Sequence, residues 1–105
     1  MSPVKNLFIS LPKDKIREFC QQYQIRNLSL FGSVLRDDFT PESDIDFLVE
    51  FLPEAKITYL DLARMERELS KILNGRKIDL RTPAELSPYF RQEVLKTAVV
   101  QYAQN

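Results

Sequence analysis

Hydrophobic residues recur along the chain with two different periods, and the change of period separates the expected helices from the expected strands. Ser10 and Pro12 precede a segment in which apolar side chains return every three or four residues, the spacing of an amphipathic helix. The apolar positions of this segment are Ile16, Phe19, Cys20 and Tyr23. The next run, NLSLF at 27–31, has the composition of a short strand and ends at Gly32.

Two further segments are expected to form strands. The turn-forming sequence TPES at 40–43 precedes DIDFLVEF at 44–51, and Pro53 ends that strand. The sequence KIDLR at 77–81 is the third expected strand. A short helix or loop is expected between the first two strands, and a helix between the last two.

Helical periods return after the second and the third strand. Thr58 and Asp61 form a capping-box pattern, with Asp in place of the usual Glu, at the start of a helix that runs to about Leu73. The pair Ser-Pro at 87–88 starts the last helix, which is expected to extend through Tyr102.

The order of these elements predicts an α/β fold, with a small mixed β-sheet of about three strands flanked by helices. A chain of 105 residues buries roughly two thirds of its unfolded surface, which is enough for one core with a site at its rim. The sequence therefore predicts a single domain over residues 1–105.

Charge and cysteine content narrow the possible surroundings. The 15 basic residues balance the 15 acidic ones, so no direct nucleic-acid binding is expected from bulk charge. The single Cys20 lies in a helical apolar pattern and is interpreted as a core thiol of a reducing compartment. Because no apolar stretch approaches membrane length, we expect a cytoplasmic protein without membrane contact.

Three aspartates lie in strand-like segments, where this residue type is disfavoured. Asp44 and Asp46 are two apart on one expected strand, so both side chains project to the same face. Two like charges that close need a proton or a cation between them. If the third strand lies beside the second, Asp79 reaches the same face. Three oxygen ligands in a chain without histidine suit Mg²⁺, or alternatively Mn²⁺.

A glycine–serine pair follows the first expected strand. Gly32 lets the backbone approach a phosphate closely, and the Ser33 hydroxyl and free backbone N–H groups can bind phosphate oxygens. Taken alone, such a pair is most often a plain turn, and an Asp-x-Asp pair often faces water. Together, with ten residues between Ser33 and Asp44 and with Ile-Asp-Leu on a third strand, the two motifs are far more specific.

This combination resembles the nucleotidyltransferase signature of the DNA polymerase beta superfamily. The string FGSVLRDDFTPESDIDFLVEF at 31–51 is similar to the minimal nucleotidyltransferase (MNT) branch, small bacterial and archaeal proteins often encoded beside a HEPN-domain toxin. The resemblance implies the nucleotidyltransferase fold and transfer of a nucleoside monophosphate from an NTP to a hydroxyl. It also implies ATP as donor and an antitoxin that adenylylates a HEPN ribonuclease, with tyrosine as the expected acceptor.

The resemblance also implies roles for the aspartates. Asp44 and Asp46 would hold two Mg²⁺ ions and the triphosphate, as in two-metal sites. Asp79 would complete the shell of the ion that binds the attacking hydroxyl, and it is also a candidate acceptor of the hydroxyl proton.

Nucleotide-binding roles fall on the segment that follows the first strand. Gly32 and Ser33 would hold the β- and γ-phosphates. Arg36 would balance triphosphate charge, although a surface arginine paired with Asp37 or Asp38 explains this residue equally well.

Two other functions stay open. The small size and the lack of a visible base-recognition domain are also compatible with a non-catalytic antitoxin that neutralises a HEPN partner by binding alone. A glycosyltransferase would also use Asp-x-Asp to bind a nucleotide through a divalent ion, but this chain is too short for a sugar-donor domain plus an acceptor site. The intact motif favours the enzyme. A docking face for the partner is expected on the last helix, around Tyr89, Val99 or Tyr102.

Overall fold

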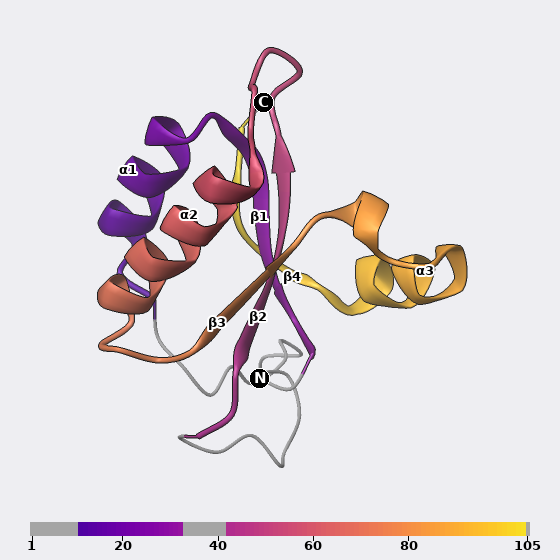
Figure 1. The fold of residues 1–105 in the computed structure, drawn as a ribbon. Helices are drawn as coiled ribbons and strands as arrows, with labels where there is room; N and C mark the ends of the chain where they lie inside the picture. Colours follow the sequence, from indigo (N-terminus) through magenta and orange to yellow (C-terminus); the bar gives the residue numbers. More distant parts are fainter. Residues whose placement is uncertain (1–10, 33–41, 105) are drawn as a thin grey trace, which may run out of the picture.

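Four strands form one mixed sheet in the order β3-β2-β1-β4, in a computed structural model that describes residues 11–32 and 42–104 (Figure 1). The elements are α1 (Lys13–Gln22), β1 (Ile25–Phe31), β2 (Ile45–Phe51), α2 (Tyr59–Ile72), β3 (Ile78–Arg81), the 3-10 helix η2 (Pro83–Glu85), α3 (Pro88–Thr97) and β4 (Val99–Ala103). β1 pairs antiparallel with β2 and with β4, whereas β2 and β3 are parallel. The predicted mixed α/β sheet is confirmed, with one strand more than expected.

Helices lie on both faces of this sheet. α1 and α2 pack on one face and α3 lies on the other (Figure 1). α2 connects β2 to β3, because parallel neighbours need a long crossover connection rather than a tight turn. Within the two described ranges, every helix is too short or too polar to span a bilayer.

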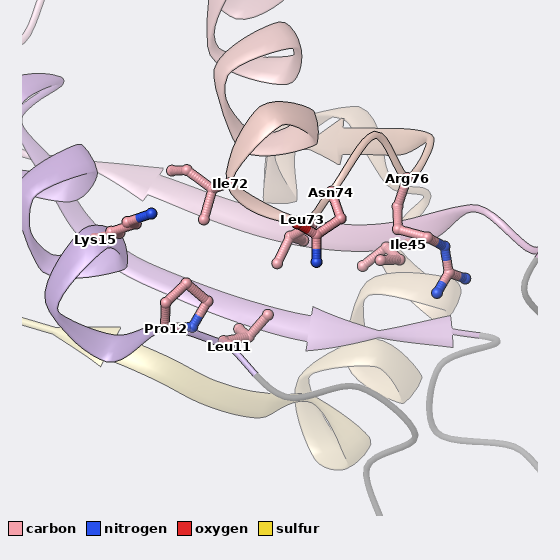
Figure 2. Close-up of a pocket in the computed structure, with 8 residues that line it drawn as sticks. All are labelled: Leu11, Pro12, Lys15, Ile45, Ile72, Leu73, Asn74 and Arg76. Atoms are coloured by element: carbon pink, nitrogen blue, oxygen red, sulfur yellow. The ribbon is translucent and has the colours of Figure 1, made fainter.

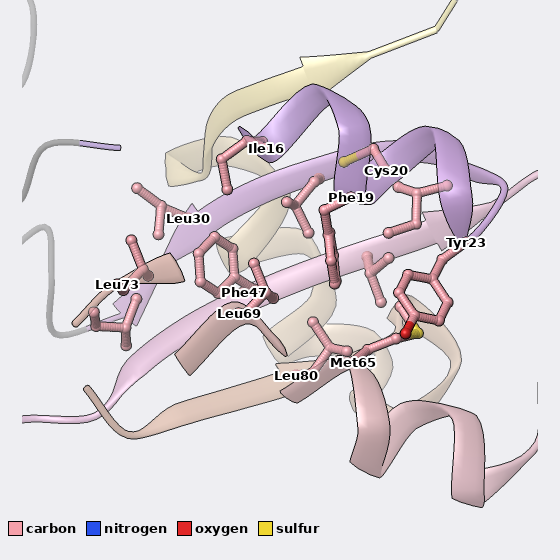
Figure 3. Packing of buried hydrophobic residues seen from close by; sticks show 14 residues of the cluster. Ile16, Phe19, Cys20, Tyr23, Leu30, Phe47, Met65, Leu69, Leu73 and Leu80 are labelled. Carbon is pink, nitrogen blue, oxygen red and sulfur yellow. The ribbon is translucent and has the colours of Figure 1, made fainter. Parts of the chain in front are cut away.

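The main core lies between the sheet and the helix pair α1–α2 (Figure 3). The apolar stripe expected on the first helix is confirmed. Its members, all buried, are Ile16, Phe19, Cys20 and Tyr23. β2 contributes Ile45, Phe47 and Val49, each 0% exposed, from alternate positions along the strand. Burial also raises the pKa of the Cys20 thiol to about 12, as expected of a core cysteine.

The C-terminal boundary of the last helix was predicted wrongly. α3 ends at Thr97, Ala98 is extended at φ −62° and ψ 144°, and the following residues form β4 instead of continuing the helix to Tyr102. The sequence VVQYA is rich in β-branched and aromatic residues, and its backbone pairs with the otherwise open edge of β1. Tyr102 still packs against the main core, but from a strand.

The ends of α2 match the sequence pattern. The Asp61 backbone N–H donates to Thr58 Oγ1 at 3.3 Å, and the Thr58 N–H donates to Asp61 Oδ2 at 2.9 Å, which completes the capping box. Beyond the helix, Asn74 and Gly75 both have positive φ, at 63° and 87°. At α1, Pro12 occupies the N-cap position without a side-chain cap, and the expected cap Ser10 lies outside the described residues.

Replacing Thr58 with alanine should lower the free energy of unfolding by about 1 kcal/mol, because the Asp61 N–H loses its acceptor. Urea denaturation followed by circular dichroism measures this loss. Lys56→Ala, an exposed change just before the helix, is the control and should leave the unfolding midpoint unchanged. Equal midpoints for the two variants would contradict a stabilising cap.

Candidate active site

Asp46 lies where β1, β2 and β3 run side by side. Its register partners are Asp79 on the parallel strand β3 and Phe31 on the antiparallel strand β1. Ile45 and Phe47 point into the main core, so Asp46 projects from the opposite face, beneath α3. Register partners on adjacent strands project to the same face. Asp46 and Asp79 therefore lie next to each other, as the sequence predicted for neighbouring strands.

Gly32 follows the last residue of β1 and lies against Asp46. Its φ of 77° belongs to the left-handed region that glycine adopts readily. A Cβ atom at this position would collide with Asp46 Oδ2 and lie 3.2 Å from Cγ. Gly32 is therefore needed both for its backbone conformation and for the space that the Asp46 carboxylate occupies. The sequence pattern indicated only a close approach to phosphate.

The remaining predicted site residues are Asp44, Ser33 and Arg36. Asp44 immediately precedes β2 and is exposed, and the next N–H, that of Ile45, donates to the Lys77 carbonyl at 2.8 Å. Ser33 and Arg36 lie outside the described residues. The structure thus brings together Gly32, Asp46 and Asp79, with Asp44 just before the strand.

Asp79 is held by an arginine that the sequence analysis did not single out. Arg81 Nε lies 3.1 Å from Asp79 Oδ1, and Arg81 Nη2 donates to Asp79 Oδ2 at 3.2 Å. This hydrogen bond and the negative charge of Asp79 raise the pKa of Arg81, with smaller contributions from Glu85 and Asp46. The available signal was the spacing, because residues two apart on a strand share a face.

Two hollows adjoin Asp46 on the α3 side. One, of about 350 Å³, is lined by Phe31, Asp46, Asp79, Arg81, Leu86 and Phe90. The other, of about 280 Å³, is lined by Phe31, Gly32, Asp46, Phe90, Glu93, Val94 and Thr97. Phe31, Asp46 and Phe90 border both hollows, so the carboxylate is reachable from the Asp79 side and from the Gly32 side.

Two carboxylates of this site, those of Asp46 and Asp79, are suitable ligands for a divalent cation. Asp46 and Asp79 offer carboxylate oxygens from adjacent strands beside a hollow, and oxygen ligands suit Mg²⁺ or Mn²⁺. Within residues 11–32 and 42–104, however, no three acidic side chains are gathered closely enough to form a metal-binding group. Both oxygens of Asp79 are bound by Arg81.

A separate hollow of about 550 Å³ lies on the other face of the sheet, by the ends of α1 and α2 (Figure 2). Its lining residues are Leu11, Pro12, Lys15, Ile45, Ile72, Leu73, Asn74 and Arg76. None of these is a predicted site residue, although Arg76 Nη2 donates to the Ser43 carbonyl at 3.1 Å, next to Asp44. The carboxylates and this basic hollow therefore lie on opposite faces of β2.

Comparison with known proteins decides the family. The profile of the family described as "Nucleotidyltransferase domain" matches residues 13–100. The chain belongs to this nucleotidyltransferase family. A relative from Methanocaldococcus jannaschii, named as a candidate protein adenylyltransferase, is 37% identical over 87 residues, which are 83% of this chain and 90% of the relative.

Solved structures agree with this assignment. A structure described as a candidate minimal nucleotidyltransferase superposes with a TM-score of 0.69 and 31% identity, covering 83% of this chain and 86% of the other. A complex of a tri-AMPylated HEPN toxin from Shewanella oneidensis with an MNT antitoxin matches with a TM-score of 0.61 and 20% identity, over 88% of this chain and 70% of the other, and it supports the fold alone. The expected enzyme class, nucleotidyltransferase, is confirmed. The roles of individual residues stay predictions.

Gly32→Ala should destabilise this nucleotidyltransferase by more than the about 1–2 kcal/mol that a side chain costs at positive φ, because the new Cβ also displaces Asp46. Gly75→Ala is a matched control, since Gly75 has a φ of 87° but open space around its Cβ position. Urea denaturation of both variants separates the cost of a side chain at positive φ from the cost of displacing Asp46. Equal losses would mean that Asp46 moves aside at no cost.

Proposed function

We propose that this nucleotidyltransferase transfers AMP from ATP to a hydroxyl group of a HEPN-domain toxin and thereby acts as its antitoxin. The observation that carries the proposal is the placement of Asp46 and Asp79 on adjacent strands, with Gly32 packed against Asp46. The adenylyltransferase name of the M. jannaschii relative and the AMPylated HEPN toxin in the S. oneidensis complex support this choice of donor and acceptor.

The reaction exchanges the phosphoanhydride bond between the α- and β-phosphates of ATP for a phosphodiester bond to the acceptor. An oxygen of the acceptor hydroxyl forms a bond to the α-phosphorus, the bond from that phosphorus to the bridging oxygen breaks, and pyrophosphate leaves. Asp44 and Asp46 would hold two Mg²⁺ ions, and Asp79 would bind the ion nearer the acceptor. Bound Mg²⁺ would stabilise the negative charge that builds on the phosphate oxygens. Asp79 would also be the candidate acceptor of the hydroxyl proton.

The two hollows suggest separate places for the two substrates, the donor on one side of Asp46 and the acceptor on the other. The donor phosphates would lie in the hollow on the Gly32 side, with Ser33 and Arg36 as further ligands. The acceptor would enter the hollow beside Asp79. Its walls include the apolar side chains of Phe31, Leu86 and Phe90, which would limit the access of water to the attacking oxygen.

Replacement of Asp46 or Asp79 by asparagine should reduce AMP transfer at least about a hundredfold, because a charged ligand of the metal ions that would stabilise the reacting phosphate is lost. The measurement is incorporation of α-labelled ATP into the HEPN-domain protein encoded beside this chain, with Mg²⁺ present. Asp14→Asn, an exposed change on α1, is the control and should retain wild-type labelling. Undiminished labelling by both site variants would refute the assignment.

Two observations favour the alternative, an antitoxin that acts by binding alone. Asp79 is already paired with Arg81, and the described residues contain no three-carboxylate group. A variant with Asp44, Asp46 and Asp79 all changed to asparagine distinguishes the two functions in cells that express the toxin. Survival with this triple variant would support binding alone. Cell death despite an intact complex would support catalysis.

A further inference from the structure

Arg81 and Asp79 form a two-point ion pair at the rim of the candidate active site. Nε is 3.1 Å from Oδ1 and Nη2 is 3.2 Å from Oδ2, so each carboxylate oxygen has one arginine nitrogen. The pair comes from one short strand, with a single residue between its members. Both side chains line the 350 Å³ hollow that also contains Asp46.

The pair contributes little to folding. The Arg81 and Asp79 side chains are 49% and 35% exposed, and exposed ion pairs of this kind typically have a small effect on stability. β3 has a separate anchor, because the Leu80 N–H donates to Glu66 Oε2 on α2 at 3.0 Å. The position of the strand therefore does not depend on Arg81, whereas the orientation of the Asp79 carboxylate does.

A metal ion and this guanidinium would need the same carboxylate. A divalent cation bound between Asp46 and Asp79 must approach an oxygen that Arg81 already contacts, and it would then lie close to a second positive charge. Charges of +2 and +1 about 6 Å apart in water repel enough to change binding about tenfold. Arg81 also orients the Asp79 carboxylate, which could favour metal binding. Because the pair is exposed, this benefit offsets only part of the repulsion.

We propose that Arg81 is a built-in counter-cation that competes with the catalytic divalent ion for Asp79. Arg81 is then a positioning residue that holds the Asp79 carboxylate next to its own guanidinium. Binding of an ion between Asp46 and Asp79 would require this contact to open. The inference rests on the metal-dependent reaction proposed above. It identifies Arg81 as the residue that lowers the affinity of the site for the metal ion.

Mn²⁺ binding, measured by electron paramagnetic resonance without nucleotide or partner, tests the competition directly. Arg81→Gln should bind Mn²⁺ about tenfold more tightly than the wild type, since the competing charge is removed. Arg81→Lys keeps the charge and should bind within about threefold of the wild type. Arg67→Gln removes an exposed arginine on α2 and is the matched control, with no change in affinity expected. Weaker or unchanged binding by Arg81→Gln would overturn the proposal.

A double-mutant cycle locates the effect at Asp79. In an Asp79→Asn background, adding Arg81→Gln should tighten Mn²⁺ binding by less than about threefold, because an ion without a ligand on β3 would bind farther from Arg81, where the repulsion is weaker. A full tenfold gain in that background would place the competition elsewhere and overturn the proposal. Thermal melting of each variant verifies that the proteins are folded during the titration.

The same variants separate this inference from the proposed function. Tighter Mn²⁺ binding by Arg81→Gln, together with no AMP transfer by the wild type, would support the competition and refute the adenylyltransferase. AMP transfer by the wild type with unaltered Mn²⁺ affinity in Arg81→Gln would do the reverse. Absence of Mn²⁺ binding by the wild type at millimolar concentrations would overturn both.

Discussion

The parallel pairing of β2 with β3 is the constraint on which the candidate site depends. It aligns Asp46 with Asp79, and a slip of one residue would turn one of these carboxylates toward the main core. Two hydrogen bonds and one chain connection support this arrangement. The Ile45 N–H donates to the Lys77 carbonyl, the Leu80 N–H donates to Glu66 on α2, and the crossover through α2 brings the two strands side by side. The geometry of the candidate site thus depends in part on a helix on the far face of the sheet.

β2 serves two cores through the alternation of its side chains. Phe47 and Val49 enter the main core, whereas Leu48 is buried with Phe31 and Val94 in a smaller cluster under α3. Asp46 lies on the same face as Leu48, at the edge of this second cluster. α3 therefore does more than cover the sheet, because it also supplies walls to both hollows that reach the carboxylate.

Sequence patterns predicted most of this arrangement because they are local. The capping box at Thr58 and the alternation around Asp46 each depend on neighbouring residues, and the structure has both. β4 was missed because apolar positions up to Tyr102 fit a helical period, while the unpaired edge of β1 that favours a strand is not visible in sequence. Arg81 was missed although its spacing of two residues from Asp79 already indicated that both side chains share one face of β3.

Carboxylates beside an apolar strand are costly unless positive charge meets them. Arg81 supplies that charge for Asp79, and Gly32 supplies the space for Asp46. Asp79 can bind another group only if its ion pair with Arg81 opens easily. Separating a buried ion pair would cost several kcal/mol of free energy. The partial exposure of both side chains keeps that cost low. An ion pair at the solvent-exposed rim can therefore open at a lower cost in free energy than a fully buried pair of the same residues.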